Sequence, residues 1–79
     1  MTDTTGILLI APHRFPDLAR EQALADKFGI EMVVAADQAE FTARMADARV
    51  VMVTPYAKMT PVEFDLLRIC NAVVRYGVG

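Results

Sequence analysis

The chain has 79 residues, enough for at most one small domain, and 54% of them are hydrophobic. The formal net charge is −2 and the eight basic residues are scattered, which argues against nucleic acid or an anionic membrane as a partner. No apolar run is long enough for a membrane span, and no basic N-terminal segment indicates a signal peptide. Cys70 is the only cysteine, so no intrachain disulfide can form and we expect a cytoplasmic protein.

The first half of the chain alternates between strand and helix patterns. Residues 7–11 form a continuous apolar run, which is typical of a strand covered on both faces. Residues 17–28 carry apolar side chains at helical spacing, and Gly29 directly after them is a common helix stop. Residues 30–35 are rich in Val, Ile and Met and predict a second strand. The order so far is strand, helix, strand.

The second half continues the alternation. Asp37, with Glu40 three residues later, resembles a capping box, and the helix that follows sets Phe41, Met45 and Ala48 on one side. Residues 49–54 predict a third strand.

The clearest local signal is Thr60-Pro61-Val62-Glu63, in which a capping threonine, a proline and a closing glutamate start a third helix. We expect Val62, Leu66 and Ile69 on its buried face and Phe64 on the opposite, exposed face. Residues 72–76 then predict a fourth strand.

These elements predict an α/β fold with three layers and a four-stranded parallel sheet. We favour the flavodoxin-like strand order 2-1-3-4, with the first helix on one face and the other two on the opposite face. A Rossmann half-unit with order 3-2-1-4 is the alternative. In the favoured order the first helix cannot reach the third and fourth strands. Val51, Val53 and Val73, or the residues that alternate with them, would then be uncovered.

Function in an open parallel sheet lies beyond the carboxyl ends of the strands, here at residues 11–14, 54–58 and 75–79. Arg75 places a charge at the end of an apolar strand, where an unpaired charge costs free energy. We therefore expect Arg75 either to face a bound anion or to form a structural salt bridge. His13 has no evident catalytic partner, and Arg14 reads as a surface charge beside Asp17. Tyr56 reads as a cover for the end of the sheet. We expect no catalytic residue and no metal site, and read Cys70 as a buried thiol.

Three segments of the chain carry a resemblance to a known family: Ala-Pro-His-Arg-Phe at 11–15, Val-Thr-Pro-Tyr-Ala at 53–57, and Val-Arg-Tyr-Gly-Val-Gly at 74–79. In this order and spacing they resemble the start of the D-isomer-specific 2-hydroxyacid dehydrogenases, and the phosphoglycerate dehydrogenase-like members most. The last segment is the most specific. The resemblance covers nearly the whole chain. It implies that residues 1–79 are part of a flavodoxin-like substrate-binding domain, the opening segment of a larger enzyme.

The resemblance also implies roles for single residues. In the family, a glycine loop after the fourth strand grips the substrate carboxylate through its backbone N–H groups, which places that role on Gly77, Val78 and Gly79. The arginine before the loop faces the acid group, and the loop after the third strand lines the cleft. These positions are Arg75, Thr54, Pro55 and Tyr56. The family's NAD site and its acid–base residues lie further along, so we expect no cofactor bound by this chain and no activity from it alone.

Two other classes of function remain open. One is a stand-alone flavodoxin-like module that oligomerises or docks on another domain, and the other is a small-ligand or sensor domain. We expect self-association through the face or edge of the third and fourth strands, because uncovered apolar side chains and open strand edges recruit partners. The expected partners are therefore a small 2-hydroxy or 2-oxo acid and a second copy of the chain or a further domain, without nucleic acid or membrane.

Overall fold

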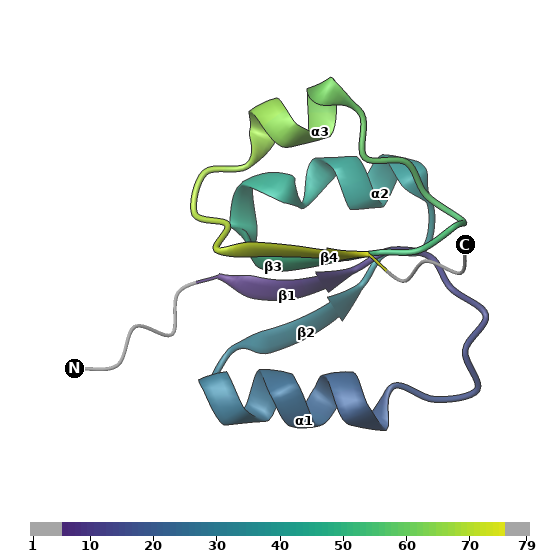
Figure 1. The fold of residues 1–79 in the computed structure, drawn as a ribbon, viewed down its shortest axis with the longest axis vertical. Coiled ribbons are helices and arrows are strands. Elements are labelled where there is room, and N and C mark those ends of the chain that lie inside the picture. The colour runs from purple at the N-terminus through teal and green to yellow at the C-terminus, as the bar shows by residue number, and fades with distance from the viewer. Residues whose placement is uncertain (1–5, 76–79) are drawn as a thin grey trace.

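Four parallel strands form one sheet in the computed structural model, which describes residues 6–75 (Figure 1). The strands are β1 (Ile7–Ile10), β2 (Glu31–Val34), β3 (Ala48–Val53) and β4 (Ala72–Arg75). Their order in the sheet is β2-β1-β3-β4, and every pair is parallel. The predicted flavodoxin-like order is therefore confirmed, and the Rossmann alternative is wrong.

The helices cover the sheet as the crossover rule predicts. Helix α1 (Ala19–Phe28) lies on one face, and α2 (Gln38–Ala43) and α3 (Pro61–Leu66) lie on the other (Figure 1). A short 3₁₀ helix, η1 (Met45–Asp47), follows α2. Right-handed crossovers alone produce this distribution once the strand order is fixed.

The core has one apolar cluster on each face of the sheet. On the face of α2, Leu9, Phe41, Met45 and Val51 are fully buried. On the face of α1, the cluster is built around Leu8, Ile10 and Ala25, among others. All four residues of β1 are buried, because this strand has a neighbour on each side and a helix layer on each face. The continuous apolar run at residues 7–11 has this physical origin.

The prediction for the buried face of the third helix is wrong. Val62 is 59% exposed and Leu66 is 40% exposed, whereas Glu63 is only 5% exposed. Ile69 lies beyond the end of α3 and is half-buried. The helix has only six residues, and its orientation is set by polar contacts of Glu63 rather than by an apolar stripe. Phe64 is 52% exposed, as predicted.

The prediction of a bare face over the third and fourth strands needs a correction. Val51 and Val53 are buried on the α2 face, and on the α1 face Met52 is also buried. The α1 layer therefore covers Met52 of β3, whereas Val50 is only half-buried. All four residues of β4 are exposed, including Val73 and Val74 at 40% each. Of the third and fourth strands, β4, at one edge of the sheet, is thus the one with exposed apolar side chains.

Candidate functional site

The loops that follow β1 and β3 meet at the carboxyl end of the sheet. The hydroxyl of Thr54 donates a short hydrogen bond to the carbonyl of Pro12 and accepts one from the backbone N–H of Tyr56 at 3.3 Å. Thr54 is only 3% exposed, so the threonine acts as a buried clasp between the two loops. Because β1 and β3 are adjacent and parallel, their following loops leave the sheet side by side.

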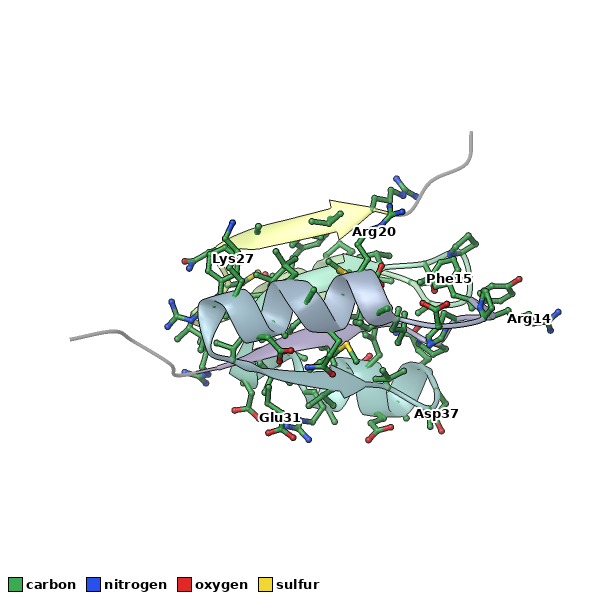
Figure 2. The ribbon with its side chains drawn as sticks, turned by 90° about the horizontal axis from the view of Figure 1, so that it is seen from below. Arg14, Phe15, Arg20, Lys27, Glu31 and Asp37 are labelled. Carbon is green, nitrogen blue, oxygen red and sulfur yellow. The ribbon has the colours of Figure 1, made fainter. Side chains whose placement is uncertain are left out.

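A second contact joins the same loops further out. The guanidinium carbon of Arg14 lies 5.1 Å from the centre of the Tyr56 ring, a distance that permits a cation–π interaction. Asp17 accepts a hydrogen bond from the Ala19 N–H at 3.0 Å, and among residues 6–75 it forms no ion pair with Arg14. Arg14 is exposed, in agreement with its reading as a surface charge. Figure 2 shows Arg14 and Arg20 at the end of the molecule toward which the strands run.

His13 takes part in the local structure of the loop after β1. Its Nδ1 accepts a hydrogen bond from the backbone N–H of Phe15 at 3.0 Å, and its ring stacks on the Phe15 ring with centroids 5.2 Å apart. A neutral histidine that accepts at Nδ1 carries its proton on Nε2. These contacts give the ring a structural role in shaping the loop.

Arg75 completes the described part of this rim. It is the last residue of β4, lies in register with Val53 and is exposed. It therefore stands beside the Thr54 loop, as the sheet order requires. Among residues 6–75, Arg44 and Asp47 form an ion pair, whereas Arg75 forms none. Pro55 and Tyr56 are exposed on the neighbouring loop. Gly77, Val78 and Gly79, to which the resemblance assigns carboxylate binding, lie outside the described residues.

The loop from β3 to α3 is fastened to α2 by a side chain that the sequence analysis missed. The Gln38 amide donates to the carbonyl of Lys58 at 3.1 Å and accepts from the Lys58 N–H at 2.7 Å. This pair of bonds joins residues 20 positions apart. A glutamine in a first helical turn gives no sequence signal for such a contact, because the partner is backbone.

Glu63 connects the same loop to both helices on this face. Its carboxylate accepts hydrogen bonds from the Thr60 N–H at 2.8 Å, from the Thr60 hydroxyl, and from the Thr42 hydroxyl at 2.7 Å. The Thr60 hydroxyl also accepts from the Val62 N–H at 3.2 Å, so the predicted capping box is present. These bonds favour the charged carboxylate and lower the pKa of Glu63 from 4.5 to about 2.

The lowered pKa predicts an acid-sensitive contribution to stability. A carboxyl whose pKa is depressed by folding stabilises the protein above its unfolded pKa, and this contribution is lost as the pH falls from 4.5 through about 2. Between about pH 6 and about pH 3, the urea midpoint of the wild type should therefore fall more than that of Glu63→Gln. Asp65→Asn, an exposed carboxyl on α3, is the matched control and should behave like the wild type. If the urea midpoints of the wild type and Glu63→Gln fell by the same amount over this pH range, the prediction would be contradicted.

Other candidates from the sequence have simpler environments. Cys70 is half-buried rather than buried, and its thiol donates to the Ala72 carbonyl at 3.3 Å. Within residues 6–75, no group of three or more His, Cys, Asp or Glu side chains is placed to hold a metal ion. No helix in this part of the chain is long and apolar enough to cross a membrane.

Comparisons with known proteins returned no match to a family model, to a curated protein or to a solved structure. The resemblance to 2-hydroxyacid dehydrogenases therefore rests on the three sequence segments alone.

Proposed function

We propose that the rim formed by Thr54, Tyr56, Arg14 and Arg75 recognises the carboxylate of a small 2-hydroxy or 2-oxo acid. In this proposal the chain supplies substrate recognition to an NAD-dependent D-2-hydroxyacid dehydrogenase, whose reaction is hydride transfer between NAD and C2 of the acid. The chain is inactive without the parts of the enzyme that carry the acid–base residues.

The observation that supports the proposal most is the position of Arg75. It is an exposed cation without an ion pair among the described residues, at the carboxyl end of β4 and in register with Val53. The Thr54 clasp and the Arg14–Tyr56 contact hold the neighbouring loops beside it. A guanidinium binds a carboxylate with two parallel hydrogen bonds, and ligands of open parallel sheets bind at this edge.

The described residues do not fit NAD. A dinucleotide is normally held by a glycine-rich turn between the first strand and its helix, where the backbone approaches the pyrophosphate. Residues 11–18, between β1 and α1, contain no glycine and two prolines, Pro12 and Pro16. Leu18 at the start of α1 has no side-chain cap hydrogen bond. The proposal therefore assigns no cofactor contact to residues 6–75.

Titration with D-lactate, followed by backbone amide shifts in NMR spectra, tests the proposal. We expect saturable shifts at Thr54, Tyr56 and Arg75, with a Kd near 1 mM, which corresponds to about −4 kcal/mol. Lactamide, which lacks the carboxylate, should give no saturable shifts. Arg75→Gln should abolish the response, whereas Arg68→Gln, an exposed arginine before β4, should preserve it. Equal responses to lactate and lactamide, or an unchanged response in Arg75→Gln, would refute carboxylate recognition.

A second candidate function is self-association, and the exposure of β4 favours it. This strand is one of the two edge strands of the sheet, all four of its residues are exposed, and Val73 and Val74 are each 40% exposed. An exposed edge presents unpaired N–H and C=O groups to a second strand. In this reading the chain is an oligomerisation module that pairs β4 with β4 of a second copy.

Sedimentation velocity at micromolar concentration tests whether the chain forms oligomers. We expect a dimer or larger oligomer for the wild type, and a monomer for Val73→Lys, because a lysine on an edge strand opposes pairing. Val62→Lys is the matched control, since Val62 is an exposed valine of α3, 59% accessible and away from the edge. It should sediment as the wild type does. A monomeric wild type would exclude the module without bearing on carboxylate recognition.

A further inference from the structure

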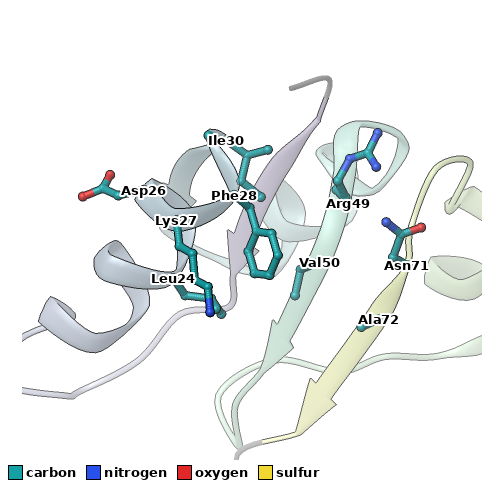
Figure 3. Close-up of a pocket in the computed structure, with 10 residues that line it drawn as sticks. Leu24, Asp26, Lys27, Phe28, Ile30, Arg49, Val50, Asn71 and Ala72 are labelled. Carbon is teal, nitrogen blue, oxygen red and sulfur yellow. The ribbon is translucent and has the colours of Figure 1, made fainter. Parts of the chain in front are cut away.

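A pocket of about 630 Å³ lies on the α1 face of the sheet, at the opposite end from the candidate rim. It opens between the carboxyl-terminal end of α1 and the amino-terminal ends of β3 and β4 (Figure 3). Its apolar walls come from all three elements and the turn after α1: Leu24, Phe28, Ile30, Val50 and Ala72. The volume is within the range of small-molecule sites, which are mostly apolar with a few polar groups.

Phe28 is the most informative wall residue. It is the last residue of α1 and is 52% exposed, and Figure 3 shows its ring in the gap between α1 and Val50. The surface helix therefore presents a large apolar ring to an open space instead of to the core. Leu24 and Val50, which also line the pocket, are half-buried. A ligand with an apolar body would bury surface that the fold itself leaves accessible to water.

The polar groups of the pocket are mainly hydrogen-bond donors. Among the described residues, Lys27, Arg49 and the Asn71 amide line it, together with one acidic residue, Asp26. Asp26 accepts a hydrogen bond from Gln22 at 2.9 Å, and Figure 3 shows it pointing away from the gap. The pocket thus has a net positive lining, although the whole chain has a net charge of −2. An anion is the favoured polar group of a ligand here.

A strand irregularity places Arg49 at the pocket. In the pairing of β1 with β3, Ile7 lies opposite Ala48 and Leu8 lies opposite Val50, so Arg49 is the extra residue of the bulge. Successive residues of a regular strand point to opposite faces, whereas a bulge re-aims a side chain. Arg49 and Val50 consequently both line the pocket. The bulge thus adds a residue with a cationic side chain to the lining of an apolar pocket.

We propose that this pocket binds an amphipathic monoanion, namely a medium-chain carboxylic acid. The alkyl chain lies along Phe28, Leu24 and Val50. Lys27, on the α1 wall of the pocket, holds the carboxylate, and Arg49 and Asn71 lie on the opposite wall (Figure 3). The site shares no residue with the rim at the other end of the sheet.

The test uses calorimetric titration of the chain with octanoate and decanoate, below their micellar concentrations, and with decanol. Affinity should rise about fourfold for each added methylene, so roughly 15-fold from octanoate to decanoate. Decanol, which has the chain without the charge, should bind at least tenfold more weakly than decanoate. Equal affinity for decanoate and decanol would overturn the proposal of an anion site.

Two pairs of matched variants locate the binding. Phe28→Ala should weaken decanoate at least tenfold, whereas Phe64→Ala, an equally exposed phenylalanine on α3, should leave it unchanged. Lys27→Gln should weaken decanoate but not decanol, and Lys58→Gln, at an exposed lysine of the loop between β3 and α3, should affect neither. Circular dichroism checks that each variant is folded. If Phe28→Ala instead dissociates an oligomer and leaves decanoate binding unchanged, the pocket is covered by a second copy and the proposal is wrong.

Discussion

Phe41→Ala should unfold most of the protein at room temperature. The side chain is fully buried between α2 and the sheet, in the cluster that contains Leu9, Met45 and Val51. Truncation of a buried phenylalanine costs about 3–5 kcal/mol, which includes the cavity it leaves. A domain of this size has a total stability at or below the lower end of about 5–15 kcal/mol. The loss is therefore comparable with the whole free energy of unfolding.

Urea denaturation followed by circular dichroism measures this effect. The wild type should show a cooperative transition, and Phe41→Ala should show a strongly reduced midpoint or no folded baseline. Phe64→Ala is the control, because the same substitution at a ring that is 52% exposed should stay within about 0.5 kcal/mol of the wild type. Equal midpoints for the two variants would mean that the α2 cluster does not carry the fold.

Local rules and the crossover rule account for the parts of the fold that the sequence predicts. The continuous apolar run at β1, the Thr60–Glu63 capping box and the glycine after α1 each depend on neighbouring residues only. Gly29 indeed adopts the left-handed conformation that a helix end requires, with φ of 69°. Strand order then follows from handedness and coverage.

The errors occur where long-range polar contacts decide the structure. A helical stripe of Val62, Leu66 and Ile69 predicts an apolar face, but the contact of Glu63 with Thr42 turns α3 so that the carboxylate points inward. Thr42 is 21 positions away in the chain, so no local pattern shows the pairing.

At the rim, the position of the three loops is predictable from the parallel sheet, whereas their contacts are not. The Thr54–Pro12 clasp and the Arg14–Tyr56 contact depend on the exact course of two loops. The pocket on the α1 face escaped prediction for a related reason. It depends on where residues 11–30, between β1 and β2, place α1 relative to β4, and on a bulge in β3 that has no sequence signature.

Gly6→Ala should be the second most damaging of the substitutions considered, at about 1–3 kcal/mol. Gly6 directly precedes β1 and has φ of 99°, a region that residues with a Cβ avoid. A Cβ at this position would lie 2.9 Å from Cδ1 of Ile69, 3.1 Å from Cβ of Arg49 and 3.1 Å from the carbonyl oxygen of Asp47. The substitution therefore adds a steric conflict to an unfavourable backbone conformation.

A double-mutant cycle separates the two contributions. Ile69→Val removes the Cδ1 atom that is closest to the new methyl group, while the backbone conflict and the contacts with Arg49 and Asp47 stay. The double variant Gly6→Ala/Ile69→Val should thus lose less stability than the sum of the two single variants, with a coupling of at least about 0.5 kcal/mol. Urea midpoints of the four proteins give this coupling. Strict additivity would show that the Ile69 contact contributes nothing to the cost of Gly6→Ala, which would then come from the backbone conformation and the contacts with Arg49 and Asp47.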